Sequence, residues 1–137
     1  MDVNQLFGYA LAVAPSGLTD RSRERIALRF RALGEPTRLK ILERLFRSPA
    51  SVSEILEATG GTQANVSKHL AILRSGGLVR RRKEGNRTVY WIADPSLEHL
   101  CAVVCDAVGR EAQEEAQALT PAATRRRVRG GAGVRAG

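Results

Sequence analysis

The chain has 137 residues, of which 43% are hydrophobic and only 4% aromatic, so we expect one small domain with an aliphatic core. Its formal net charge of +8 favours a polyanionic partner such as nucleic acid. No stretch approaches the ~18 apolar residues of a membrane-spanning helix, so a membrane is not an expected partner.

The first segment, residues 1–18, lacks the basic start of a secretion signal, and polar residues interrupt its apolar run. This pattern predicts a short amphipathic helix or arm rather than a targeting segment. We therefore expect a cytoplasmic protein, in which the two cysteines are reduced thiols.

Two helices are expected next along the chain. A helix over residues 20–33 follows a cap at Thr19 or Asp20. A helix over residues 36–47 begins with Pro36, which suits the first helical turn because its ring fixes φ. Both segments carry apolar residues at helical spacing, and those of residues 36–47 predict a broad buried stripe.

A helix-turn-helix is expected between residues 51 and 75. Ser51 and Glu54 have the spacing of a capping box, which predicts the start of a short helix. Gly60 and Gly61 then form a turn into a second helix over residues 62–75. Two short helices joined by such a turn are typical of a DNA-binding motif whose second helix enters the major groove.

The second helix places an apolar row opposite side chains that form hydrogen bonds. Glutamine and asparagine can read adenine, hydroxyl groups can bond bases or phosphates, and lysine suits a phosphate. The alternative for these polar residues is an ordinary solvated surface, and His69 is either a DNA contact or a packing residue. The DNA contacts predicted on this helix are Thr62, Gln63, Asn65, Ser67, Lys68, His69 and Arg74.

Two short strands, near residues 78–83 and 87–93, follow the helix and flank the turn-forming residues 83–86. A helix-turn-helix with a basic hairpin predicts a winged helix, so the expected fold is mainly α with a small β-hairpin (α+β). The hairpin side chains either form a solvated charged surface or contact phosphates and the minor groove. The expected contacts are Arg80, Arg82 and Arg87.

A last helix is expected over residues 96–118. A narrow apolar seam along it predicts pairing with a second copy, giving a homodimer joined through terminal helices. The winged helix-turn-helix domain with its dimerisation helix is thus expected over residues 19–118. Residues 119–137 form an Arg/Gly/Ala-rich tail that we expect to be disordered, and it either adds non-specific DNA binding or is a solvated end. The seam residues are Leu97, Cys101, Val104 and Val108.

Residues 26–108 together resemble the ArsR/SmtB family of bacterial winged-helix repressors. The resemblance rests on LGEPTRLKIL at 33–42, on the pattern Q-x-x-V-S-x-H-L-x-x-L at 63–73, and on Val89-Tyr90 in the wing. It implies a homodimer that binds an operator near its own promoter. It also implies release of DNA when an effector binds, often a metal or metalloid ion and sometimes an oxidant or reactive sulfur species.

The chain departs from the best-known sensor patterns of that family. The metalloid pattern needs cysteines in the helix before the recognition helix, and residues 51–60 contain none. The zinc- and nickel-type pattern needs Asp/His and His/Glu pairs in the last helix, where His99 stands alone among histidines. Neither ligand set carries over to this sequence.

Cys101 and Cys105 lie four residues apart, so one helix presents both on nearly the same side. That spacing is too wide for an unstrained disulfide, but two thiolates can hold one soft ion. Two copies of the helix can bring up to four sulfurs together. The pair therefore senses a thiophilic metal or metalloid ion or a thiol oxidant, or else consists of small apolar residues in the dimer seam.

The sequence thus predicts a sequence-specific DNA-binding regulator and not an enzyme, because neither cysteine has an activating histidine at a suitable spacing in its helix. The leading expectation is an effector-released repressor on a double-stranded operator that is an imperfect palindrome. The alternative is a winged-helix regulator without a small-molecule effector, controlled by its abundance or by a protein partner.

Overall fold

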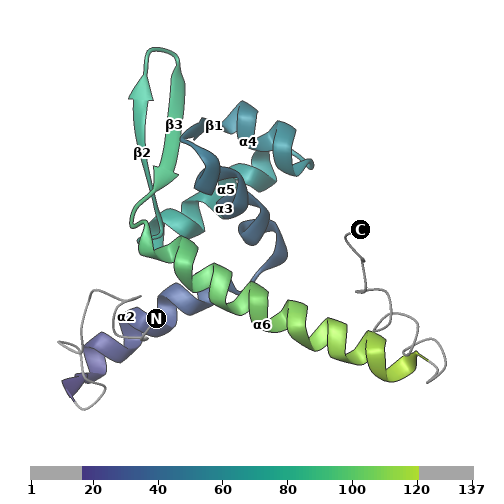
Figure 1. The fold of residues 1–137 in the computed structure, drawn as a ribbon. Coiled ribbons are helices and arrows are strands. Elements are labelled where there is room, and N and C mark those ends of the chain that lie inside the picture. The colour runs from purple at the N-terminus through teal and green to yellow at the C-terminus, as the bar shows by residue number, and fades with distance from the viewer. Residues whose placement is uncertain (1–16, 121–137) are drawn as a thin grey trace, which may run out of the picture. The chain divides into compact units, whose positions relative to one another are not determined.

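The computed structural model describes residues 17–120 (Figure 1). The expected N-terminal arm over residues 1–18 and the expected tail over residues 119–137 lie almost entirely outside the described range. The chain divides into two compact units, one up to Asp94 and the other from Pro95. The elements of the first unit are α2 (Asp20–Leu33), α3 (Pro36–Arg47), β1 (Ala50–Ser51), α4 (Val52–Thr59), α5 (Gln63–Ser75), β2 (Val79–Glu84) and β3 (Arg87–Ile92). The second unit contains α6 (Ser96–Leu119).

Side chains cap the start of every helix in the first unit. The Oγ1 of Thr19 accepts from the amide of Ser22 at 3.2 Å, and the Oγ of Ser51 accepts from the amide of Glu54 at 3.3 Å. Each such cap contributes about 1 kcal/mol because it satisfies an amide that the helix leaves without a partner. The expected helix starts at Pro36 and after Ser51 are confirmed.

The core of the first unit lies between three helices and the sheet. α3 contributes an apolar stripe, α4 contributes Ile55, and α5 contributes an inward row. The sheet closes the core with Val79, Val89 and Tyr90. The largest fully buried side chains are Ile41, Leu42, Ile55, Val66, Leu70, Leu73 and Val79.

The sheet has three strands in the order β1-β3-β2, where the sequence predicted only a hairpin. Ala50 pairs with Tyr90 and Ser51 with Val89, so β1 adds an antiparallel edge to the expected hairpin. A two-residue strand is too short to show the alternation by which strands are recognised, which is why the sequence did not predict it. β1 ties the start of α4 to the wing, because Ser51 is also the N-cap of α4.

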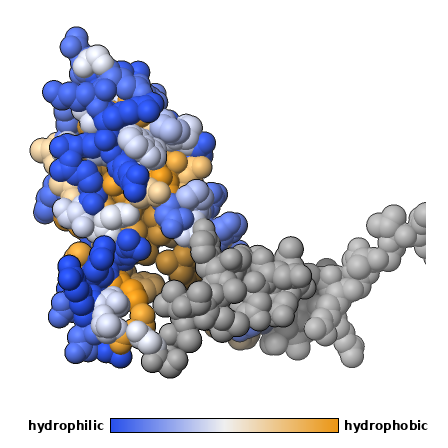
Figure 2. All heavy atoms as spheres, turned by 90° about the vertical axis from the view of Figure 1, so that its left-hand side faces the viewer, coloured by the Kyte–Doolittle hydropathy of each residue, from blue (hydrophilic) through white to orange (hydrophobic). Residues whose placement is uncertain are grey.

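The hairpin of β2 and β3 runs in register from Val79–Ile92 to Glu84–Arg87. Gly85 in its turn has a φ of 62°, a left-handed conformation that favours glycine. β2 begins and ends one residue later than predicted, at Val79 and Glu84, and β3 ends one residue earlier, at Ile92. The hairpin end at the top of Figure 2 is mostly hydrophilic, as a basic wing requires.

Two helices leave apolar side chains exposed in the single chain. On α2 the buried residue is Ala32, whereas Ile26 and Phe30 are 41% and 57% exposed. On α6, described by itself, Val104 and Val108 of the predicted seam are 55% and 57% exposed. Within residues 17–120, no helix is long and apolar enough to span a membrane.

Candidate nucleic-acid interface

Helix α5 is held against the body by its inward row, and this decides which side chains are free to bind DNA. Val66, Leu70 and Leu73 are each fully buried, so the helix has one rotational setting. Thr62 fixes its start by accepting a hydrogen bond from the amide of Asn65 at 3.2 Å. Leu78 fixes its end, where its amide donates to the carbonyl of Leu73 at 3.0 Å.

The predicted contact residues of α5 other than His69 are all exposed. Gln63, Ser67 and Arg74 are separated by four and seven residues, so they form one row along the flank of the helix. Asn65 lies two residues from Ser67, which places it about 200° around the helix on the other flank. Lys68 lies between the two flanks, on the side opposite the core.

His69 is buried, with 8% of its surface exposed, so of its two interpretations the packing role fits its position. Its Nδ1 lies 3.3 Å from Nη1 of Arg38 and 3.6 Å from Oε2 of Glu35. We therefore do not count His69 among the groups that are free to reach DNA. It instead links the recognition helix to the junction of α2 and α3.

Arg38 is the centre of that junction. Its Nε donates to the carbonyl of Ala32 at 2.6 Å, and its Nη2 donates to the carbonyl of Arg31 at 3.1 Å. Glu35 caps α3 by accepting from the amide of Arg38 at 2.9 Å. This hydrogen bond is the main reason that the pKa of Glu35 lies below its ordinary value, and a hydrogen bond from the amide of Thr37 lowers it further.

Two of the three predicted wing contacts are already bonded within the protein. Arg82 forms an ion pair with Glu84 at 2.6 Å, and its guanidinium lies 5.5 Å from the ring centroid of Trp91. Arg87 forms an ion pair with Glu54 of α4, whose other oxygen lies 3.4 Å from Nη2 of Arg44. Arg87 therefore braces the wing against the helix-turn-helix, and only Arg80 of the three has no such partner among the described residues.

Glu54 has two roles at the start of α4. Its side chain accepts a hydrogen bond from the hydroxyl of Ser51, the N-cap, and it forms an ion pair with Arg87. The pKa of Glu54 is lowered from its ordinary value, first by the hydrogen bond from the Ser51 hydroxyl and then by the Ser51 amide and Arg87. The capping-box spacing identified Glu54 as a helix start. Nothing local identified its pairing with Arg87, because the two residues are 33 positions apart.

The two cysteines lie on α6 as free thiols, Cys101 partly buried and Cys105 exposed. The pKa of Cys101 is raised, first by its burial and then by its electrostatic interaction with Cys105, so the reactive thiolate form of Cys101 is disfavoured at neutral pH. In the described part of one chain, no group of three or more His, Cys, Asp or Glu residues is arranged to hold a metal ion. One chain thus offers at most the two sulfurs that the sequence predicted.

The helix-turn-helix with its three-stranded sheet and basic hairpin defines the class, a winged helix-turn-helix DNA-binding protein. A family model described as "Bacterial regulatory protein, arsR family" matches residues 35–81. The HTH-type transcriptional regulator Rv0081 of Mycobacterium tuberculosis is 38% identical over 82 residues, which are 59% of this chain and 72% of that protein. This chain belongs to the ArsR family of bacterial transcriptional regulators, and its relatives are DNA-binding regulators rather than enzymes.

Solved structures and a further relative agree with this assignment. The crystal structure of Rv0081 matches with a TM-score of 0.64 and 32% identity, over 72% of this chain and 99% of that chain. The homodimeric winged helix-turn-helix domain of Mb0332 from Mycobacterium bovis matches with a TM-score of 0.61 and 36% identity, over 73% and 94% of the chains. A probable mercury resistance operon repressor of Streptomyces lividans is 39% identical over 71 residues, 52% of this chain and 57% of that protein.

Proposed function

We propose that this chain is a homodimeric repressor that binds a palindromic operator through α5 and leaves it when an effector reacts at α6. The observation that carries the DNA-binding part is the split of α5 into a fully buried row and an exposed polar row beside a basic wing. Base reading is assigned to Gln63 and Ser67 on one flank and to Asn65 on the other, with Lys68 and Thr62 on phosphates.

The homodimer is proposed from the exposed apolar side chains of α6, which include Val104 and Val108 of the predicted seam and the neighbouring Leu100 and Val103. Leu100, Val103, Val104 and Val108 are each between 36% and 57% exposed in the single chain, a large apolar surface for one helix. A second copy of α6 is the simplest cover for that seam, and Mb0332 is described as homodimeric. Two recognition helices about 34 Å apart then require two half-sites one turn apart, which gives an imperfect palindrome.

The effector is proposed to be a thiophilic metal or metalloid ion or a thiol oxidant that acts at Cys101 and Cys105. Their spacing on one helix turn suits two thiolate ligands, and a dimer seam can double that number to four. A relative named as a mercury resistance operon repressor supports this class of effector. The ion would bind without a third protein ligand from the described part of the same chain.

A second candidate is a regulator of the same DNA-binding design with no small-molecule effector. The raised pKa of Cys101 favours it, because a partly buried thiol in an apolar seam behaves as a small hydrophobic residue. Regulation would then come from the abundance of the protein or from a partner protein.

The experiment that separates the two is binding to a duplex from the protein's own upstream region, measured by fluorescence anisotropy. The complex is titrated with Zn(II), Cd(II), Hg(II), As(III) and diamide, with and without reductant, using wild type and Cys101→Ser/Cys105→Ser. Release by one agent in wild type but not in the double variant supports sensing at these thiols. No release by any agent favours the second candidate, whereas release that is equal in both proteins refutes sensing at these two thiols.

A further inference from the structure

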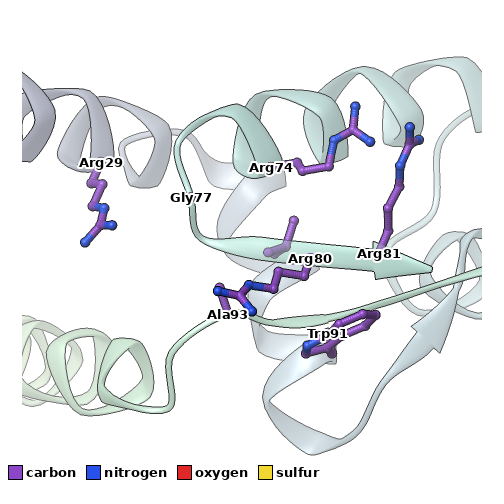
Figure 3. A pocket seen from close by; sticks show the side chains of 8 residues that line it. Arg29, Arg74, Gly77, Arg80, Arg81, Trp91 and Ala93 are labelled. Carbon is purple, nitrogen blue, oxygen red and sulfur yellow. The ribbon is translucent and has the colours of Figure 1, made fainter.

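A basic hollow of about 550 Å³ opens in the first unit where α2, the end of α5 and the base of the wing meet (Figure 3). Four guanidinium groups line it, together with the ring of Trp91 on β3. They come from three elements that are far apart in the sequence. The four are Arg29 of α2, Arg74 of α5, and Arg80 and Arg81 of β2.

The backbone places these residues around one turn and the start of β2. Gly77, with a φ of 75°, turns the chain from α5 into β2, and the turn is held by its amide donating to the carbonyl of Arg74 at 3.0 Å. The Nη2 of Arg29 lies only 3.5 Å from where a Cβ on Gly77 would stand, so α2 reaches this turn. Arg80 pairs across the sheet with Trp91, and alternation along β2 sends Arg81 to the side of α5 in Figure 3.

These four guanidinium groups have no partner among the described residues, as is also true of Arg31 and Arg47, but unlike those two they lie around one hollow. Within residues 17–120, none of the four makes a hydrogen bond or an ion pair, whereas Arg38, Arg44, Arg82 and Arg87 all do. The lining also contains no carboxylate, so nothing in the hollow offsets the like charges. A site of this kind gains most from an anion with several charges.

We propose that the hollow binds phosphates of the DNA backbone beside the recognition helix, a proposal that rests on the DNA-binding function above. Arg74 lines the hollow and also belongs to the row of α5 that contains Gln63 and Ser67. The hollow therefore extends the proposed DNA-binding surface of α5 toward α2. A guanidinium group can form two parallel hydrogen bonds to one phosphate. Four guanidinium groups spread over three elements therefore suit several successive phosphates of a DNA strand.

A small-molecule anion fits the hollow less well. Apart from Trp91 and the arginines, the lining consists of glycine, valine and alanine, so it offers no hydroxyl or amide side chain that would orient one particular compound. Small-molecule sites owe their selectivity to a few placed polar groups of mixed type, whereas contacts to the DNA backbone can be made by arginines without such groups. Arg29 and Arg81 were not among the residues that the sequence singled out, because neither lies on the recognition helix or in a spacing that marks it.

The test uses the full chain with Arg29→Ala and Arg81→Ala, and Arg31→Ala as the matched control. Arg31 is an exposed arginine of the same helix that does not line the hollow, and its carbonyl bond to Arg38 survives the substitution. Anisotropy is measured over a range of salt with the upstream duplex and with an unrelated duplex of equal length. Circular dichroism and the melting temperature establish that each variant is folded.

Each hollow variant is expected to weaken binding to both duplexes by a similar factor, about tenfold for a dimer, and to lower the salt slope by about 2, since each lost phosphate contact removes about 0.9. Arg31→Ala should change neither. Hollow variants that match Arg31→Ala, or a loss confined to the upstream duplex, would overturn the proposal.

Pyrophosphate at matched ionic strength should not displace DNA, and displacement that requires Arg29 would instead make this a site for a free anion. If wild type does not prefer the upstream duplex, the operator function fails while an Arg29-dependent salt slope still supports the phosphate site.

Discussion

Replacing Arg38 with leucine should destabilise the first unit by about 2–4 kcal/mol, since hydrogen bonds to charged groups contribute about 1.5–3 kcal/mol each. The guanidinium bonds the carbonyl of buried Ala32 at 2.6 Å and approaches buried His69 at 3.3 Å, and both lose their partner. The third bond, to the carbonyl of Arg31, is exposed, so water replaces it at little cost. Leucine keeps most of the stem's packing, so the change reports mainly on the bonds.

Urea unfolding followed by circular dichroism at 222 nm measures this free energy. Arg47→Leu is the control, because Arg47 is an exposed arginine of the same helix, and it should cost less than about 0.5 kcal/mol. Arg38→Lys should fall between the two, since an ammonium group cannot serve both carbonyls and His69 at once. Equal unfolding free energies for Arg38→Leu and Arg47→Leu would refute the claim that this guanidinium holds α5 to the α2–α3 junction.

Three further predictions follow from the packing, the charges and the reading row. Leu70→Ala should lower the free energy of unfolding by about 3–5 kcal/mol in the same urea assay, because Leu70 is fully buried between helices. Because its pKa is lowered, ionised Glu54 stabilises the fold at pH values above the ordinary pKa of 4.5, and this stabilisation is lost as the pH falls through the lowered pKa. Glu54→Gln should therefore make the free energy of unfolding fall less steeply in acid than it does in wild type. Gln63→Ala should reduce the preference for the upstream over an unrelated duplex by about 1–3 kcal/mol, with an unchanged salt slope, whereas a parallel loss on both duplexes would contradict base reading.

Much of the first unit is readable from the sequence, because the signals that fix it are local. Ser51 with Glu54, Pro36, and glycine at 85 each act within a few residues of the feature they determine. β1 escaped prediction for the opposite reason. Ala50 joins a sheet only because Tyr90 returns beside it, a pairing across 40 positions that no local pattern records.

His69 shows where periodicity falls short at the candidate site. It follows Val66 by three positions, which places it on the edge of the inward row, yet its chemistry also suits DNA. What decides between the two roles is the position of Arg38 and Glu35 in another helix. A spacing rule within α5 cannot supply that information.

The same limit applies to the arginines and affects function. The sequence gives their number, but only the tertiary structure shows which of them are bonded within the protein. Those that are bonded, such as Arg38 and Arg87, hold helices and wing in place, so their loss should weaken DNA binding together with stability. Those without partners, such as Arg29 and Arg81, carry charge that only an outside anion can meet, so their loss should weaken binding alone. A net charge of +8 is therefore a poor measure of DNA affinity in this fold. The part of that charge that reaches phosphate is set by which acids the tertiary structure places against which arginines.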